Sequence, residues 1–325
     1  MKNFKIIKMT NLNLSLDNLY NKSFKNIEIP LVYEISKELH QAIETAFYLG
    51  QPLLLTGEPG SGKTTLAEKL ASDLYYISNG SFNQKARRFN TKSSTTYQDL
   101  FYSYDAIGHF HDANMKKEIK LNLSNYIELN AFGSAIIASL KPDERINVQA
   151  KNLPKTGEPR NSVVLIDEID KSPREFPNDL LNELENFTFQ IKEAGLNFFT
   201  KPEDSKIFTI ITSNNEKQLP EAFLRRCIYF HLDFPEIEFL KIILKNHALI
   251  SQLNGNEDIL LEYFNELREI CRNTKPSTAE LIAWCRIIGY KKIDVKDKET
   301  LVETLSIVVK NKEDLHLVKQ RWFSN

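Results

Sequence analysis

The chain has 325 residues, of which 42% are hydrophobic and 26% are charged, and its formal net charge is −1 at pH 7. The length suffices for one large domain and a smaller one, and the composition is that of a globular protein. A net charge so close to zero provides no global basic field, so we do not expect direct nucleic-acid binding. No apolar run approaches the length of a membrane span, and no signal peptide is evident. The three cysteines lack metal-type spacing, which favours reduced thiols in a cytoplasmic protein.

The first part of the chain is an N-terminal arm followed by a helix and a strand. Residues 1–30 are rich in Asn and Lys, and their role is not defined by the sequence. From Ile35 to Leu49 the apolar residues recur at helical spacing, and Gly50 is a suitable stop. Residues 52–55 predict a short buried strand, and a second helix is expected from Lys63 to about residue 75.

A phosphate-binding pattern joins this strand to the second helix. Its glycines let the backbone curl and turn N–H groups inward as an anion nest, and the helix that follows adds its positive N-terminal end. In such a loop Lys63 reaches the β- and γ-phosphates of a nucleotide, and the hydroxyl of Thr64 is a ligand for Mg²⁺. The alternative is a glycine-rich turn without a ligand, which the Lys-Thr pair and both flanks disfavour. The predicted nucleotide-binding residues are Gly57, Glu58, Pro59, Gly60, Ser61, Gly62, Lys63, Thr64 and Thr65.

The next segment contains a predicted strand, Ala86–Asn90, and then a polar turn that runs into aromatic residues at 97–104. Two interpretations of the aromatic residues stay open: core packing beside a solvated turn, or a loop that grips a polymer or a partner. His109, His111 and Asp112 invite a metal interpretation, which the lack of further nearby His or Cys disfavours. Residues 126–140 then predict a helix, and residues 141–161 an exposed loop.

An acid pair follows the most apolar segment of the chain. Residues 163–166 are all apolar, which predicts a strand buried on both faces, and Asp167 and Glu168 stand at its carboxyl end. This is the Walker B pattern, in which Asp167 holds Mg²⁺ directly or through water and Glu168 acts as general base on the attacking water. The alternative, a capped strand end with solvated acids, is disfavoured by the P-loop about a hundred residues earlier.

The remaining α/β part repeats the strand–helix pattern. We predict a helix at Pro177–Glu185, a hairpin at 187–202, and a buried strand at Ile207–Ile211 that leads into the polar residues 212–215. A polar side chain there is placed to orient the lytic water. A short helix at 219–227, which carries Arg225 and Arg226, precedes a last strand at 229–232.

Residues 236–325 are helical by periodicity, with predicted helices at Glu236–Ser251, Ile259–Cys271, Thr278–Tyr290, Glu299–Val309 and Asp314–Trp322. The predicted fold is α/β: a P-loop NTPase αβα sandwich around a parallel sheet at 31–235, followed by a small all-helical lid domain at 236–325, with residues 1–30 as the arm.

The chain resembles an AAA+ ATPase of the MoxR type over roughly residues 31–290. Beyond the P-loop and the acid pair, the resemblance is carried by 90–95, 98–102, 169–174, 177–183 and 219–227. It implies ATP and Mg²⁺ as cofactors and a ring, usually hexameric, with ATP at the subunit interfaces. It further implies Asn214 as the sensor-1 residue and Arg226 as the arginine finger, with Arg225 as a close rival. Together with Lys63 and Glu168, these side chains form the predicted catalytic set.

One position departs from the family pattern. Related proteins often place a sensor-2 arginine at the start of a lid helix, and Ala279 stands at that position here. Lys275 is an alternative cation that would approach from another direction.

Three functions remain in competition. The favoured one is an Mg²⁺-dependent ring ATPase that remodels or activates partner proteins; the resemblance implies a partner with a von Willebrand factor A domain and includes bacterial defence among the settings. A GTPase is the second, because Asn311-Lys-Glu-Asp314 fits the guanine-reading pattern; Asp167–Asp170 lacks the glycine that a GTPase needs. The third is a nucleotide-gated switch or scaffold that acts on DNA or a signalling partner.

Overall fold

The computed structural model describes residues 33–115, 122–145, 148, 150–155, 157–158, 160–195, 198–253 and 255–323. The predicted N-terminal arm, 1–30, lies outside the described residues. The chain divides into two compact units. One unit is built on the sheet, and the other contains the P-loop segment Thr56–Thr65 and the chain from His231 onward.

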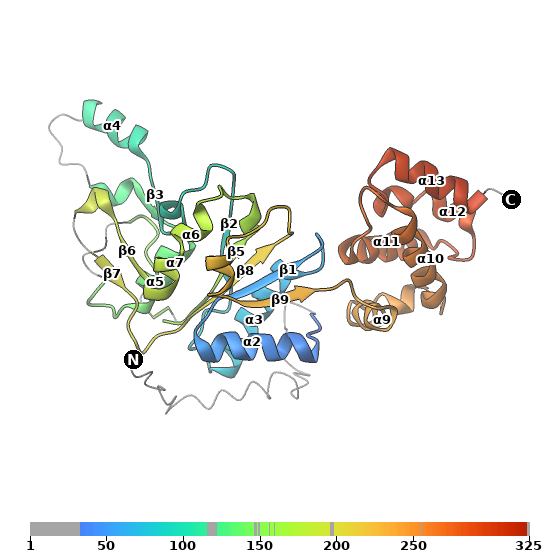
Figure 1. The fold of residues 1–325 in the computed structure, drawn as a ribbon, viewed down its shortest axis with the longest axis horizontal. Coiled ribbons are helices and arrows are strands. Elements are labelled where there is room, and N and C mark those ends of the chain that lie inside the picture. Colours follow the sequence, from blue (N-terminus) through green and yellow to red (C-terminus); the bar gives the residue numbers. More distant parts are fainter. Residues whose placement is uncertain are drawn as a thin grey trace. The chain divides into compact units, whose positions relative to one another are not determined.

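Five strands form the central sheet, in the order β2-β5-β8-β1-β9 (Figure 1). β5 pairs in parallel with β2 on one side and with β8 on the other. Every residue of β1, β5 and β8 is buried, which explains why these segments are the most apolar runs of the sequence. The predicted α/β fold with a parallel sheet is confirmed. The strands are β1 (Leu53–Gly57), β2 (Arg87–Asn90), β5 (Ser162–Asp167), β8 (Ile207–Ser213) and β9 (Ile228–Leu232).

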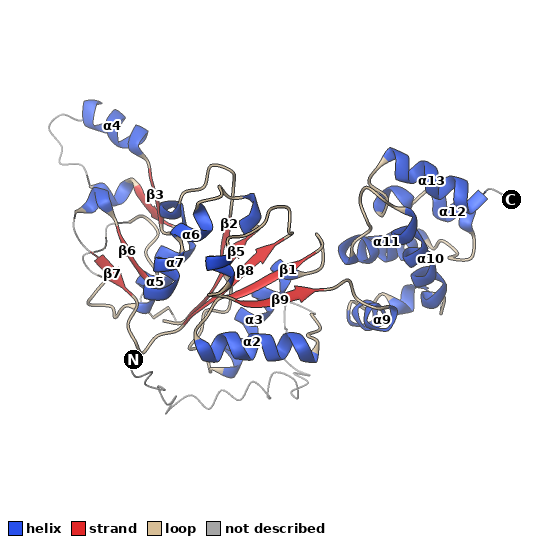
Figure 2. Ribbon diagram, viewed as in Figure 1, coloured by secondary structure: helices blue, strands red, loops and turns tan. Residues whose placement is uncertain are grey.

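Helices cover the sheet on opposite sides (Figure 2). α2 (Lys37–Leu49) packs through Phe47 on Phe208 of β8, with the ring centroids 5.5 Å apart. α3 (Lys63–Ile77) continues directly from the P-loop. α5 (Ala131–Ser139) lies across the sheet from α2 and is buried at all nine residues. Shorter helices accompany α5: α6 (Phe176–Asp179), α7 (Leu181–Asn186) and α8 (Glu221–Leu224).

The predicted helix at 126–140 is wrong in its first part. Residues Ile127–Leu129 form strand β4, which pairs antiparallel with β3 (Tyr102–Tyr104). The burial pattern buried–exposed–buried shows the period of two that a strand requires. In the chain, β3 is followed by α4 (Ala106–Met115) before β4 begins. The sequence did not indicate this helix, and it has no buried residue.

The aromatic residues at 97–104 belong in part to the core. Phe101 and Tyr102 are buried in the main hydrophobic cluster, and the ring of Phe101 stacks on Phe189 with centroids 5.2 Å apart. The core-packing interpretation is therefore confirmed for these two residues. Tyr97 is 38% exposed and contributes little to the core.

Two further sequence predictions need correction. The segment 141–161 is not simply exposed, because Arg145 and Val148 are buried. The Nε of Arg145 donates to the carbonyl of Leu140 at 3.0 Å, which satisfies a polar group left open at the end of α5. The helix predicted at 177–185 is interrupted at Leu180, where α6 ends and α7 begins. The hairpin after it is confirmed as β6 (Thr188–Gln190) and β7 (Phe198–Thr200).

The C-terminal region is helical as predicted and has its own hydrophobic cluster, which includes Leu240, Phe264 and Trp284. The helix predicted at 299–309 is shorter than expected, because Thr304 accepts from the Trp284 indole and donates to a neighbouring carbonyl instead of continuing the helix. The helices are α9 (Ile237–Asn246), α10 (Glu257–Ile270), α11 (Thr278–Lys291), α12 (Lys298–Val302) and α13 (Lys312–Phe323).

Candidate functional site

The loop between β1 and α3 has the backbone that the P-loop pattern requires. Gly57, Gly60 and Gly62 have φ values of +148°, +75° and +93°, in the region that glycine adopts readily. A Cβ atom at Gly60 would lie 2.5 Å from the Cβ of Ser277, and one at Gly57 would lie 2.5 Å from the carbonyl oxygen of Leu232. The tight curve of the loop therefore depends on glycine for both conformation and space.

Lys63 is folded back over this curve. Its Nζ donates to the carbonyls of Gly57 at 2.8 Å and Glu58 at 2.9 Å, and its side chain is buried. These contacts hold the ammonium group inside the concave side of the loop. A curled backbone, a buried ammonium group and the start of α3 together suit the phosphates of a nucleotide.

Asp167 ends strand β5 and is buried, with a polar partner on each carboxylate oxygen. Its Oδ1 accepts from the hydroxyl of Thr212 at 2.5 Å, and its Oδ2 accepts from Arg88 at 2.6 Å. Thr212 also accepts from the N–H of Glu168 at 2.8 Å. The hydroxyl of Thr212 thus bonds to both members of the acid pair. The carboxylate of Asp167 is also the kind of oxygen ligand that Mg²⁺ prefers.

Glu168 has a left-handed backbone, with φ +57° and ψ +51°, which is uncommon for a non-glycine residue. Its Oε1 lies 3.4 Å from the amide Nδ2 of Asn214, and its Oε2 accepts from Lys171 at 2.7 Å. The hydrogen bond to Glu168 raises the pKa of Lys171 above its usual range. The structure therefore brings the amide of Asn214 close to Glu168 and adds a cation, Lys171, that was not predicted.

Backbone anchors fix the carboxyl ends of β5 and β8. The buried carboxylate of Asp170 accepts from the N–H groups of Asn214 at 3.1 Å and Glu216 at 3.0 Å. On the other side of β5, the hydroxyl of Thr91 donates to the carbonyl of Asp167 at 3.1 Å. The loops that carry the candidate catalytic side chains are therefore tied to one another.

The two adjacent arginines predicted as finger candidates are on the surface and in ion pairs. Arg226 pairs with Glu185 of α7 and is 46% exposed, and Arg225 pairs with Glu221 and is 74% exposed. Arg226 also makes a second hydrogen bond, from its Nη1 to the carbonyl of Ala222 at 3.3 Å.

The remaining candidates do not form a second site. His109 bonds to the Tyr104 hydroxyl and stacks on Tyr126 with ring centroids 4.7 Å apart, and among the described residues no group of His, Cys, Asp or Glu is placed to hold a metal ion. All three cysteines are buried free thiols, and burial raises the pKa of Cys227 and Cys285 to about 12. In the part of the chain that is described, no helix is both long and apolar enough to cross a membrane.

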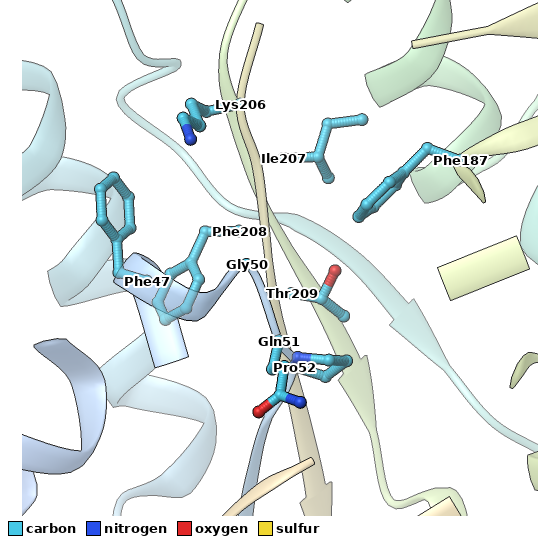
Figure 3. Close-up of a pocket in the computed structure, with 9 residues that line it drawn as sticks. All are labelled: Phe47, Gly50, Gln51, Pro52, Phe187, Lys206, Ile207, Phe208 and Thr209. Atoms are coloured by element: carbon cyan, nitrogen blue, oxygen red, sulfur yellow. The ribbon is translucent and has the colours of Figure 1, made fainter. Parts of the chain in front are cut away.

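A cavity of about 30 Å³ lies at the amino ends of β1 and β8, whereas the P-loop and the acid pair lie at the carboxyl ends of β1 and β5 (Figure 3). Phe47 and Phe208 line one part of it, and Phe187 and Ile207 line another. A cavity of this size holds no more than a few water molecules, so a nucleotide does not fit there.

The comparison with known families agrees with this geometry. The family model described as AAA domain (dynein-related subfamily) matches residues 52–227, which is more than half of the chain. The chain belongs to this family. The match starts one residue before β1, contains both the P-loop and the acid pair, and ends at Cys227, next to the candidate finger arginines.

A solved structure of the FIGL-1 AAA domain in complex with ADP also matches the chain. It shares 20% sequence identity and a TM-score of 0.36, and the likeness covers 84% of this chain and 78% of that one. No curated protein matches the chain. As a member of the AAA domain family, the chain contains an ATPase domain of the P-loop class, which implies that it binds and hydrolyses ATP.

Four contacts of the AAA domain were not singled out from the sequence. They are made by Arg88, Thr91, Lys171 and Thr212. Arg88, Thr91 and Thr212 bond to Asp167 from neighbouring strands or their ends, and Lys171 bonds to Glu168 from three residues further along the chain. The polar stretch 212–215 after a buried strand was a signal for Thr212. Thr91 and Lys171 lie in stretches that carry the family resemblance, 90–95 and 169–174, but their contacts were not predicted, and Arg88 gives no signal in the sequence.

Proposed function

We propose that the protein is an Mg²⁺-dependent ATPase of the MoxR type that works as a ring and remodels or activates partner proteins. The observation that carries the ATPase proposal is the hydroxyl of Thr212, which bonds both to the Asp167 carboxylate and to the N–H of Glu168. This arrangement gives the two acids fixed and different positions. One is buried at the strand end, and the other is turned out by a left-handed backbone toward Asn214.

Each predicted residue has a role in this proposal. Residues Gly57–Thr65 hold the phosphates, with Lys63 as the cation, and Thr64 and Asp167 would hold Mg²⁺. When bound, Mg²⁺ neutralises charge that develops on the phosphates. Glu168 takes a proton from the attacking water, and the Asn214 amide orients that water. The P-loop and Asp167 both follow strands of one parallel sheet, and the carboxyl ends of such strands are where ligands of open α/β sheets bind.

The ring and the arginine finger are the parts of the proposal that involve a second subunit. Arg226 is half exposed on the surface, where it bonds to Glu185 and to the carbonyl of Ala222, and this exposure supports a role at a subunit interface. In a ring it would stabilise the charge of the transition state on the adjacent subunit's nucleotide.

The identity of the partners rests on the sequence resemblance. MoxR-type proteins work with partners that carry von Willebrand factor A domains, and metal-cofactor insertion, complex maturation and bacterial defence are their settings. A protein client, rather than nucleic acid, fits the near-zero net charge of the chain.

The structure disfavours the GTPase alternative. Asn311 caps the start of α13, where its Oδ1 accepts from the N–H of Glu313 at 2.8 Å. Asp314 is fully buried and accepts from the N–H groups of Arg272 and Asn273 at 3.1 and 3.2 Å. Both residues of the apparent guanine-reading pattern therefore have structural roles in the helical region.

The test is phosphate release from ATP and GTP at equal concentration, with and without Mg²⁺. We expect hydrolysis that prefers ATP, requires Mg²⁺ and is lost in Lys63→Ala. A preference for GTP would contradict the proposal in favour of the second function. ATP binding without measurable hydrolysis, alone and with a von Willebrand factor A-domain protein, would favour the nucleotide-gated switch.

A further inference from the structure

The phosphate-binding loop contains a carboxylate of its own. Glu58 directly follows Gly57, and its side chain is 42% exposed. Its charge has the same sign as that of a bound phosphate, and like charges a few ångströms apart repel each other. The ammonium group of Lys63 faces the backbone carbonyls of the loop, so the charge of Glu58 is met by a different cation.

Arg268 of α10 supplies that cation. Its Nη2 donates to Oε2 of Glu58 at 2.7 Å, and its side chain is only 11% exposed. Its guanidinium also lies 3.3 Å from the ring centroid of Phe234, and its Nη1 donates to the carbonyl of Pro276. An arginine held by a ring, a carbonyl and a carboxylate has little freedom to move. Lys275 is a weaker partner, with its Nζ 4.0 Å from Oε1 of Glu58.

The start of α11 does not offer an alternative donor. Ser277 touches the loop at Gly60, and its backbone and hydroxyl are both bonded to the carboxylate of Glu280 in a capping box. Ala279, which stands where related proteins have an arginine, has no polar side chain. The cationic contact to the loop therefore comes from the end of α10 and not from the start of α11.

We propose that Arg268 is a positioning residue of the nucleotide site, which neutralises Glu58 and so permits phosphate binding in the loop. The proposal rests on the proposed function, in which this loop binds ATP. Because Arg268 bonds to both Glu58 and the carbonyl just before α11, it also links the loop to the connection between α10 and α11.

The test is a set of nucleotide affinities, measured with a fluorescent ATP analogue and Mg²⁺ on Glu168→Gln protein, which prevents hydrolysis. In this background Arg268→Gln is expected to weaken binding on the order of tenfold, because it leaves the charge of Glu58 uncompensated. The Glu58→Gln, Arg268→Gln double variant is expected to bind as Glu58→Gln alone does, because without the carboxylate the loss of Arg268 leaves no uncompensated charge. Arg272→Gln, an exposed arginine four residues along, is the matched control and should not change affinity.

Three outcomes separate the possibilities. An unchanged affinity in Arg268→Gln, or a double variant as weak as Arg268→Gln, overturns the inference. Failure of the parent protein to bind ATP contradicts the proposed function instead, and Lys63→Ala supplies the baseline for that result. If Arg268→Gln does not fold, Arg268→Met replaces it, because methionine keeps a long apolar stem against Phe234 and has no charge; its loss of affinity must again be recovered by Glu58→Gln, and no recovery overturns the inference.

Discussion

The guanidinium of Arg88 lies 2.6 Å from Oδ2 of Asp167, so the buried carboxylate at the end of β5 has a protein counter-ion. The strand register explains this contact, since Asn90 of β2 is opposite Asp167 and Arg88 is two residues earlier on the same face. Arg88 also donates to Asn90 at 2.7 Å, which holds it in place. A metal ion at Asp167 would therefore share or replace an existing positive charge.

Arg88→Gln is expected to destabilise the ligand-free protein and to increase its stabilisation by Mg²⁺ with ADP. The loss should be about 1 kcal/mol, because Asp167 is buried while Arg88 is half exposed to solvent. Thermal unfolding with and without Mg²⁺ and ADP measures both effects. Arg174→Gln, an exposed arginine, is the control. Equal ligand-induced shifts in Arg88→Gln and wild type would show that Arg88 and the metal do not compete.

Glu168→Gln is expected to retain ATP binding and to lose turnover by roughly two orders of magnitude or more, because the amide cannot accept the proton of the attacking water. Steady-state phosphate release and nucleotide affinity, measured on the same preparation, separate the two effects. Lys171→Gln is the companion variant, since it removes the ion pair but keeps the base. Turnover that is unchanged in Glu168→Gln would remove Glu168 from its proposed role.

Mixtures of Arg226→Ala and Lys63→Ala subunits are expected to recover activity that neither variant has alone. Some interfaces in the mixture pair an intact P-loop with an intact finger, so shared sites must yield turnover. Mixtures of Arg225→Ala with Lys63→Ala provide the comparison, because Arg225 has the more exposed ion pair. If the mixtures show no activity beyond the separate variants, the sites are not shared between subunits through Arg226.

Gly60→Ala is expected to abolish nucleotide binding, because its Cβ would lie 2.5 Å from the Cβ of Ser277 and its φ is +75°. Gly157→Ala is the matched control, since Gly157 has a similar φ of +86° but open space around the position. Both variants share the backbone strain of a non-glycine residue at positive φ, about 1–2 kcal/mol, and only Gly60→Ala has the clash. Nucleotide affinity and unfolding temperature measure the difference; equal behaviour of the two variants would contradict the packing argument.

The parts of the site that are local in sequence could be predicted from it. The P-loop and the acid pair are short patterns next to strongly apolar strands, and the parallel sheet followed from those strands. The contacts that the sequence missed join distant positions: Thr212 and Asp167 are 45 residues apart, Arg88 and Asp167 are 79 apart, and Arg268 and Glu58 are 210 apart. A polar residue gives no sign of such a partner until the strands and helices are placed.

Strand β4 illustrates a different limit. Only Asn130 separates its three residues from α5, and the apolar residues of both elements together fit a helical period. Ile127–Leu129 form a strand instead because the pairing with β3 gives their backbone the hydrogen-bond partners that a helix would have supplied within itself.

The P-loop segment Thr56–Thr65 belongs to the same compact unit as the chain from His231 onward. This sets a limit on how far the chain can be shortened from its C-terminal side. A shortened chain that ends at Pro235 would keep the five-stranded sheet, the complete family match and all predicted catalytic residues. It would lack Arg268 and Ser277, the residues against which Glu58 and Gly60 are packed. We therefore expect the smallest fragment that binds nucleotide with full affinity to be longer than the segment by which the family is recognised.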